Sequence, residues 1–307
     1  MPAERRLRAM GSELHLLAEG AGAERSIRAA IAEIDELEQR WSRFRPGSEL
    51  CRLNAASGSA IELSEVTFDA VCRAVQAWRD TYGYFDPTVL PALERAGYDR
   101  SFDQLAPSGG AGDDPGTVAG LPSPGCAGIV LDAASRTVLL PPGVRLDLGG
   151  IGKGLAADRV VELMLDAGAE GALVNIGGDV RVGGVAPSPE GWLIDVDDRA
   201  LVSLSAGAVV TSSVARRRWL VRGRSFHHLI DPATGLPAES GLMTVAVLGA
   251  SAASAEVVAK ASLIAGERVG SSLIAEHGMA ALLVGSDGIS RRVGGFEAFE
   301  LPVPVVR

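Results

Sequence analysis

Apolar residues in the first third of the chain recur with the 3.6-residue period of amphipathic helices. The pattern predicts one helix over residues 23–41 and a second from Ser64, whose side chain can cap it, to about Tyr82. Residues 85–88, with the sequence Phe-Asp-Pro-Thr, end the second helix. The inner face of the first helix consists of Ile27, Ile31, Ile34, Leu37 and Trp41.

Farther along the chain, short apolar runs alternate irregularly with helical patterns. Helices are predicted over about 154–167, 252–265 and 270–278. This irregular alternation favours an α+β (mixed α/β) fold with largely antiparallel sheets in a single domain spanning residues 1–307. The predicted strands are 13–19, 129–131, 137–140, 173–176, 192–196, 208–210, 219–222, 244–248 and 280–284.

Two stretches of the chain show neither a helical nor a strand pattern of apolar residues. Residues 42–50 are polar and predict a turn. Residues 106–128 are dominated by Gly, Pro, Asp and Ser, and they predict a mobile loop or insertion rather than a linker between domains.

Composition narrows the class of protein. With 307 residues and 47% hydrophobic content the chain can bury a large core, and a net charge of −9 argues against a nucleic acid as the main partner. Three widely spaced cysteines without a C-x-x-C motif indicate a reducing compartment. No signal-like apolar segment and no apolar run of ~18 residues occurs, so we expect a cytoplasmic protein without stable membrane insertion.

The most informative segment is the glycine-rich turn at residues 147–154, with the sequence Asp-Leu-Gly-Gly-Ile-Gly-Lys-Gly. A helix begins directly after it, so backbone N–H groups and the positive end of the helix dipole are available to a phosphate, and Lys153 adds a cation. The turn matches neither G-x-G-x-x-G nor the P-loop pattern. Close packing of the backbone explains the glycines equally well, and the segment alone leaves both interpretations open.

Seven segments in order along the chain resemble the FAD:protein FMN transferase family, the ApbE-type flavin transferases. They cover nearly the full length, and their order is more specific than any one of them. The segments are residues 10–12, 41–54 (as Trp-Ser-Arg-Phe, Ser-Glu-Leu and Leu-Asn), 85–89, 147–158, 175–179, 211–213 and 228–235.

The resemblance implies an ApbE-like fold with a central cofactor cleft and an enzyme that binds FAD, usually with Mg²⁺. Such an enzyme transfers the FMN half of FAD through a phosphoester bond to a Ser or Thr of an acceptor protein, and AMP leaves. Two other functions stay open: an FAD-binding or flavin-trafficking protein without transfer activity, and a hydrolase that splits FAD into FMN and AMP.

Matched position by position, the resemblance also implies roles for single residues. Gly150, through its carbonyl, and Glu256 would face the metal. The residues themselves, rather than the resemblance, make His228, Thr211 and Lys260 the catalytic candidates, with the Thr211 hydroxyl placed to hydrogen-bond the pyrophosphate. The cofactor-binding residues would be Met10, Phe44, Phe85, Asp86, Thr88, Asp147, Lys153 and Ile230.

The sequence departs from the family at the metal site. The family usually has an Asp and, four residues later, a Thr; this chain has Glu256 and Lys260. At this spacing the two side chains share one helix face, but an ammonium group cannot ligate a cation. Lys260 could stand in for the charge of the metal, the metal could have fewer protein ligands, or FAD could be bound without turnover. A solvated surface ion pair is the simplest alternative.

The segment around His228 also allows structural interpretations. His227 and His228 could form a general base, or a histidine near this turn could cap a carbonyl group. Residues 231–235, with the sequence Asp-Pro-Ala-Thr-Gly, form a good β-turn whatever the function. The basic run 216–218 could steer an anionic ligand or lie at a solvated strand end.

Overall fold

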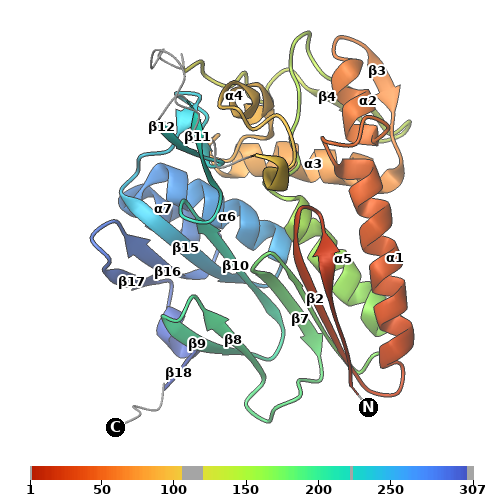
Figure 1. Ribbon diagram of the computed structural model, residues 1–307, viewed down its shortest axis with the longest axis vertical. Coiled ribbons are helices and arrows are strands. Elements are labelled where there is room, and N and C mark those ends of the chain that lie inside the picture. The colour runs from red at the N-terminus through yellow and green to blue at the C-terminus, as the bar shows by residue number, and fades with distance from the viewer. Residues whose placement is uncertain (1, 106–119, 222–223, 303–307) are drawn as a thin grey trace.

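A computed structural model describes residues 2–105, 120–221 and 224–302. Its centre is an eight-stranded sheet in the order β1-β2-β6-β7-β10-β15-β16-β17, in which every neighbouring pair is antiparallel (Figure 1). The strands are β1 (Ala3–Ala9), β2 (Ser12–Glu19), β6 (Gly171–Ile176), β7 (Asp179–Gly184), β10 (Gly207–Ser213), β15 (Leu242–Gly249), β16 (Ala280–Gly285) and β17 (Ser290–Val293).

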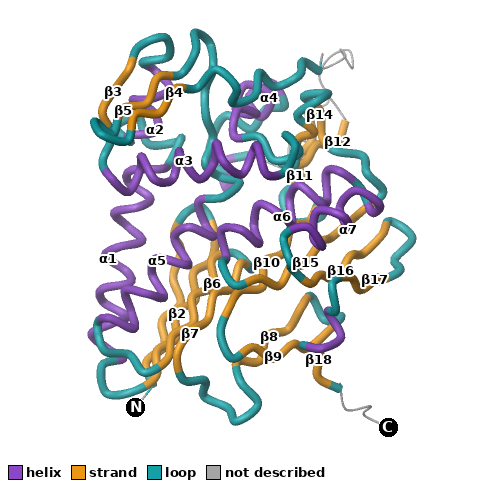
Figure 2. The backbone as a smooth tube through the Cα atoms, turned by 180° about the vertical axis from the view of Figure 1, so that it is seen from behind, coloured by secondary structure: helices purple, strands orange, loops and turns teal. Residues whose placement is uncertain are grey.

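Four helices cover one face of this sheet, as Figure 2 shows from behind. They are α1 (Ala23–Trp41), α5 (Gly152–Asp166), α6 (Ala252–Ala265) and α7 (Glu267–Glu276). The main apolar core fills the space between these helices and the sheet, and α5 and α6 are apolar on most of their surface because they are enclosed on several sides.

The opposite face of the sheet packs against a small three-stranded sheet. It consists of β8 (Trp192–Val196), β9 (Ala200–Leu204) and β18 (Glu300–Leu301), in the order β18-β9-β8, with the single-turn helix η3 (Phe296–Ala298) beside it. A second apolar core that includes Val182, Trp192 and Phe296 lies between the two sheets.

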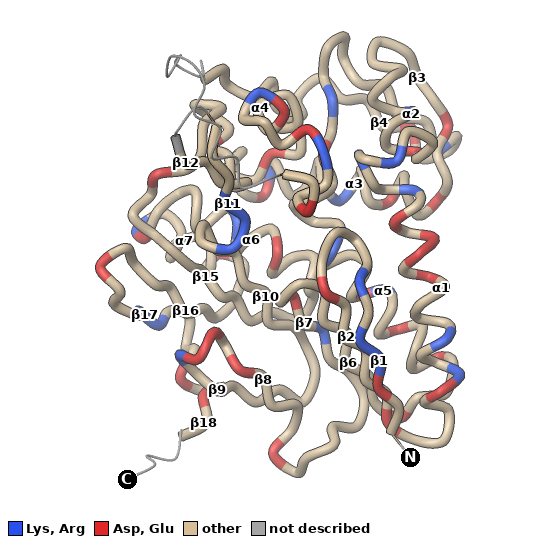
Figure 3. The backbone as a smooth tube through the Cα atoms, in the orientation of Figure 1, with Lys and Arg blue, Asp and Glu red and all other residues tan. Residues whose placement is uncertain are grey.

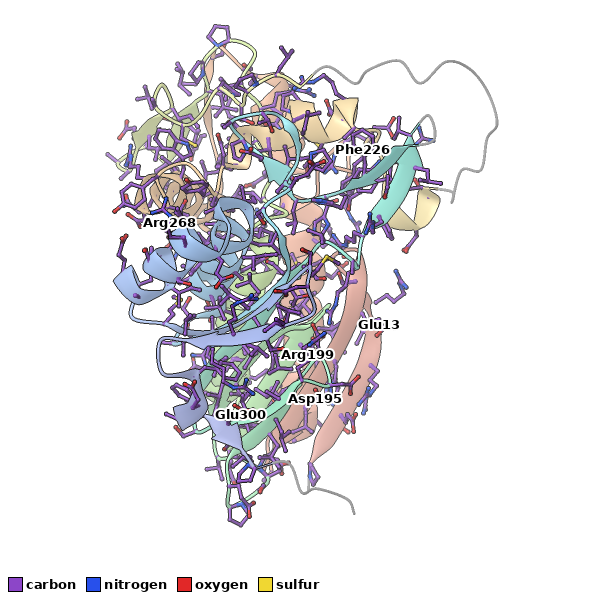
Figure 4. The ribbon with its side chains drawn as sticks, turned by 90° about the vertical axis from the view of Figure 1, so that its left-hand side faces the viewer. Glu13, Asp195, Arg199, Phe226, Arg268 and Glu300 are labelled. Atoms are coloured by element: carbon purple, nitrogen blue, oxygen red, sulfur yellow. The ribbon has the colours of Figure 1, made fainter. Side chains whose placement is uncertain are left out.

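The remaining elements gather at one end of the helix layer, at the top of Figure 1. Figure 4 places Phe226 at this end and, toward the other, Asp195 and Glu300 in the small sheet and Arg199 in the turn between β8 and β9. The elements are α2 (Glu49–Ala55), β3 (Ala60–Glu62), α3 (Glu65–Asp80), η1 (Pro87–Val89), α4 (Leu90–Arg95), η2 (Phe102–Gln104), β4 (Val130–Asp132), β5 (Thr137–Leu139), β11 (Arg218–Val221), β12 (Arg224–His227), β13 (Ile230–Asp231) and β14 (Leu236–Pro237).

The predicted α+β class with largely antiparallel sheets is confirmed, and α1 has the predicted bounds. The turn predicted over 42–50 ends earlier than expected, because residues 49 and 50 already belong to α2. Ser48 caps this helix by accepting a hydrogen bond from the Cys51 N–H. The seventh helix begins at Glu267 rather than near 270. Residues 106–119 of the predicted loop and Arg222 of the predicted strand lie outside the described residues.

The predicted strand over residues 208–210 extends in both directions and becomes β10. Strands β1, β7 and β9 were not predicted. Strand β1 is highly charged, β7 ends in two glycines, and β9 has too few polar residues to show an alternating pattern. In the part of the chain that the structure describes, no helix is both long enough and apolar enough to cross a membrane.

Helix α6 is anchored to α5 by the side chain of Asp158. This carboxylate accepts hydrogen bonds from the N–H groups of Ala252 and Ala253 at 2.8 and 2.9 Å, and from the Ser251 hydroxyl at 2.8 Å. Arg181 donates a fourth bond at 2.9 Å. Asp158 therefore satisfies the free N–H groups at the start of a helix that belongs to another part of the sequence.

We expect Asp158→Ala to lower the free energy of unfolding by about 2–3 kcal/mol, because the start of α6 and the Arg181 guanidinium lose their acceptor. Urea denaturation measures this change. Asp166→Ala, which removes an exposed carboxylate from the end of the same helix, should change stability by less than about 0.5 kcal/mol. Equal effects of the two variants would contradict the anchoring role.

Candidate functional site

A cavity of about 320 Å³ opens between the upper elements and the ends of the helices. Its wall comes from the β1–β2 turn, the end of α1 and the residues after it, the loop before α4, the glycine-rich turn, the segment after β12, and α6. The lining residues include Met10, Glu38, Arg43, Phe44, Phe85, Asp86, Tyr98, Asp147, Gly149, Gly150, Lys153, Arg217, His228, Ile230 and Lys260.

The glycines of the turn serve two different purposes. A Cβ atom on Gly150 would lie 2.8 Å from the Phe85 ring and 3.6 Å from the Cδ of Lys260, so the missing side chain keeps space open at the cavity wall. A Cβ atom on Gly154 would lie 2.5 Å from the carbonyl oxygen of Ala252, so this glycine lets α5 and α6 touch. Ligand space and close packing, the two explanations that the sequence left open, are both present at different positions.

Behind the turn, two lysines from different helices meet one buried carboxylate. Glu256 on α6 has no exposed surface, and its Oε1 lies 2.8 Å from the Lys260 Nζ and 3.4 Å from the Lys153 Nζ. Its Oε2 accepts a hydrogen bond of 2.8 Å from the Gly154 N–H. Lys153 also forms an ion pair with Asp179, which is 1% exposed. The alternative of a solvated surface ion pair is therefore wrong.

The two ammonium groups hold Glu256 in its ionised form. Burial by itself would raise the pKa of Glu256, but the ammonium groups of Lys153 and Lys260 lower it to about 2. Burial, together with the nearby Lys260 and Arg217, lowers the pKa of Lys153 to about 8, against the attraction of Glu256. The carboxylate is consequently ionised throughout the physiological range.

His228 lies in the cavity wall beside these cations. Its pKa is well below the usual 6.5, because the ring is buried and because Arg217, Lys260 and Lys153 are close by. Its Nδ1 atom is buried and has no hydrogen-bond partner among the described residues. Arg217 donates to the Ser12 hydroxyl at 2.8 Å, and Figure 3 shows its basic run as the blue segment just before β11.

The opposite wall of the cavity is aromatic. The guanidinium carbon of Arg43 lies 4.2 Å from the ring centre of Phe44 and 4.5 Å from that of Tyr98. Its Nη1 donates to the Tyr98 carbonyl at 2.8 Å, and its Nε lies 3.8 Å from Asp147. The Nη2 of Arg43 is buried and has no hydrogen-bond partner among the described residues. This wall thus presents flat surfaces and one unused donor to a ligand.

Most residues predicted to bind the cofactor are assembled around this cavity. Met10 lies at the tip of the β1–β2 hairpin with φ +50°, and its N–H donates to Glu38 at 2.8 Å. Phe85, Asp86 and Ile230 also line the cavity. Thr88 does not: it is fully buried and donates to Asp86 at 2.7 Å, so it orients that carboxylate.

Thr211 is not in the cavity wall. Side chains of β10 alternate between the two faces of the sheet, and Thr211 follows Val209 onto the face of the small sheet, away from α5 and α6. The predicted catalytic position of Thr211 is therefore wrong. The structural interpretations hold for two neighbours, since His227 contacts the Ala238 carbonyl at 3.2 Å and Asp231 accepts a bond of 2.9 Å from the Ala233 N–H.

The residues expected to face a metal do not suit a divalent cation as they are arranged. Both oxygens of Glu256 already have partners, and two ammonium groups lie within 3.4 Å of Oε1. Among the described residues no group of three or more His, Cys, Asp or Glu side chains could hold a metal ion. A cation at Oε1 would have to displace Lys260 and remain beside Lys153.

Comparison with known proteins identifies the family. The model of the ApbE family matches residues 10–283 of the chain. This chain belongs to the ApbE family.

Curated relatives and solved structures within the ApbE family cover most of the chain. The FAD:protein FMN transferase of Treponema pallidum (strain Nichols) is 28% identical over an alignment of 294 residues, which covers 88% of this chain and 80% of the relative. That of Escherichia coli (strain K12) is 25% identical and covers 84% of this chain and 76% of the relative. The crystal structure of the ApbE protein from Thermotoga maritima superposes with a TM-score of 0.84 at 26% identity, covering 98% of this chain and all of the other.

Sequence reasoning missed four residues that the fold brings to the site: Asp179, Arg43, Arg217 and Tyr98. Asp179 ends the Asn-Ile-Gly-Gly-Asp segment and Arg43 lies in Trp-Ser-Arg-Phe, so both were inside segments that resemble the ApbE family. Arg217 belongs to a basic run whose role was left open. Tyr98 carried no signal in the sequence.

Asp147→Ala should weaken FAD binding by roughly 1–3 kcal/mol, the range for removing one partner from buried polar groups. Asp147 lines the cavity, and its Oδ1 accepts the Gly149 N–H at 3.0 Å, so the carboxylate both faces a ligand and shapes the turn. Flavin fluorescence quenching measures the affinity. Asp166→Ala is the control for loss of a carboxylate, and an Asp147→Ala protein that binds FAD as the control does would rule out contact between this turn and the cofactor.

Proposed function

We propose that this single-domain protein is an FAD:protein FMN transferase. It binds FAD in the cavity and transfers the FMN moiety through a phosphoester bond to a Ser or Thr of an acceptor protein, and AMP leaves. One observation carries the proposal: Lys153, Lys260 and Arg217 converge with an uncharged His228 at the place where Gly150 leaves the wall open.

Phosphoryl transfer needs positioning and positive charge more than covalent help from the protein. The acceptor hydroxyl oxygen bonds to the phosphorus of the FMN half, the bond from this phosphorus to the bridging oxygen breaks, and its electron pair leaves with AMP. Lys153, Lys260 and Arg217 compensate the charge that develops on the phosphate oxygens. Membership in the ApbE family and the names of the curated relatives support this reaction.

His228 is the group that takes the proton from the acceptor hydroxyl. A general base has to be uncharged at working pH, and burial beside three cations keeps this imidazole neutral. Its Nδ1 has no partner among the residues described, so in the tautomer with the hydrogen on Nε2 this atom accepts the proton.

The aromatic wall holds the flavin and adenine rings. Phe44, Tyr98 and the Arg43 guanidinium offer stacking surfaces, and Met10 and Phe85 close the apolar sides. Asp86, Asp147 and Ile230 complete the binding site. Cytoplasmic location stays a prediction.

Incubation of the pure protein with FAD separates the candidate functions. A transferase releases AMP in proportion to the FMN bound to an acceptor protein, which mass spectrometry detects. A hydrolase releases AMP and free FMN without an acceptor, and an FAD-binding protein releases no AMP.

FAD should bind at least about tenfold more tightly than FMN. The cavity has aromatic surface for a second ring system and cations for a pyrophosphate rather than a single phosphate. Isothermal titration calorimetry with each flavin measures both constants. Equal affinities would show that the adenylate half makes no contact and would contradict the proposed binding mode.

His228→Gln should slow FMN transfer by about 10²–10⁴-fold, the usual contribution of a general base, and change FAD affinity little. In the unmodified protein, kcat/KM should stay constant from pH 7 to pH 6, because a depressed pKa keeps the imidazole neutral as the pH falls and Lys153, with a pKa of about 8, stays charged. A histidine with the ordinary pKa of about 6.5 would lose roughly three quarters of its neutral form at pH 6.

The control is His15→Gln, on strand β2 and outside the cavity wall. It should transfer FMN at the normal rate. A His228→Gln protein with normal transfer would remove His228 from the reaction. A roughly threefold fall in kcat/KM of the unmodified protein between pH 7 and pH 6 would contradict the depressed pKa of the imidazole.

A further inference from the structure

The chain contains only two lysines, and both are at the same carboxylate. The other 27 of its 29 basic residues are arginines. Lys153 comes from the first turn of α5 and Lys260 from the middle of α6, yet both ammonium groups lie within 3.4 Å of Glu256 Oε1. A lysine ammonium is a compact point charge that fits where the broad, planar guanidinium of arginine does not.

The carboxylates here act as supports for the lysines. Glu256 and Asp179 are 0% and 1% exposed, whereas the side chains of Lys153 and Lys260 are 17% and 13% exposed and line the cavity. The negative charges are therefore enclosed in protein, and the positive charges are the ones that face the ligand space.

The inner end of the cavity carries more positive than negative charge. Lys153 and Lys260 pair with the carboxylates of Asp179 and Glu256. The third cation, Arg217, donates its hydrogen bonds to the Ser12 hydroxyl and the Gly11 carbonyl, which are neutral. One positive charge thus has no anionic partner within the cluster. An anion that enters this end gains the attraction of a partly buried cation whose own desolvation is already largely complete.

The space next to the lysines is also open. Gly150 has no side chain, and a Cβ atom there would lie 3.6 Å from the Cδ of Lys260. A phosphate group at this position could contact both ammonium groups together, much as it would contact a divalent cation.

We propose that Lys153 and Lys260 together form a built-in cation site for the pyrophosphate of FAD, and that this protein binds FAD without a divalent metal. The inference rests on the proposed function for the identity of the ligand. It follows from the arrangement at Glu256, where the lysines occupy the oxygen that a metal ion would need.

The first test is FAD binding by the 307-residue protein with excess EDTA and with added Mg²⁺ or Mn²⁺. We expect the dissociation constants to agree within about twofold. A tenfold or larger loss of affinity in EDTA that Mg²⁺ restores would overturn the inference and leave the proposed function intact. No binding of FAD under any of these conditions would overturn both.

The second test uses Lys260→Gln, which keeps an unbranched polar side chain and removes the charge. FAD should bind about 10- to 100-fold more weakly, as expected for loss of one charge-assisted hydrogen bond, while riboflavin, which has no phosphate, should bind as before. Lys260→Thr should in addition regain FAD affinity when Mg²⁺ is added. Equal losses for FAD and riboflavin would indicate a structural role and would overturn the inference.

Arg268→Gln is the matched control, because it removes one positive charge from the exposed side of α7, where Figure 4 labels Arg268. It should leave the affinities for FAD and riboflavin unchanged. A loss as large as that of Lys260→Gln would mean that net charge, rather than the lysine pair, attracts FAD.

A third readout needs no activity. Because the chain has two lysines, protein labelled with ¹³C at the lysine Cε gives two ε-methylene signals in an NMR spectrum. Both should shift on addition of FAD, and neither should shift on addition of Mg²⁺ alone. Movement of the signals with Mg²⁺, or their failure to move with FAD, would contradict the built-in site.

Discussion

The close contact between the start of α5 and α6 is the constraint on which the site depends. Gly154 lies against the Ala252 carbonyl, where a Cβ atom has no room, and its N–H donates to Glu256. Asp158, one turn later, caps the first N–H groups of α6. Through these contacts the two helices meet at a fixed register, so that Lys153 on one and Lys260 on the other reach the same carboxylate oxygen.

The resulting cavity has a cationic end and an aromatic wall. Its inner end has cations, an uncharged histidine and an open backbone, which suit a phosphate ester. Its outer wall has stacked aromatic and guanidinium groups, which suit flat rings. FAD has the same division into charged and aromatic parts, and this match connects the geometry to the names of the curated relatives in the ApbE family.

The buried carboxylates illustrate how context changes the role of a residue type. An acidic side chain near a phosphate site usually suggests a metal ligand. Glu256 has both oxygens occupied by protein donors, so here it orients the lysines and stays ionised because of them. Asp179 has the same relation to Lys153.

The sequence by itself determined the α+β class, the bounds of α1 and membership in the ApbE family. The first two rest on local periodicity, and the third on seven short segments in order. The sequence also predicted most of the cavity wall, from Met10 to Ile230, because these residues lie in those segments. It was wrong about Thr211, since the face that a strand residue occupies depends on the register of the whole sheet.

Only the tertiary structure decided what Glu256 and Lys260 do. Their spacing is compatible with a solvated ion pair, a metal site or a buried cluster, and these differ in burial and in the partners that come from other elements. Lys153 reaches Glu256 from 103 residues away along the chain, and Asp179 joins the cluster by pairing with Lys153, 26 residues before it. No local pattern encodes contacts of that range, because they arise from how the helices pack on the sheet.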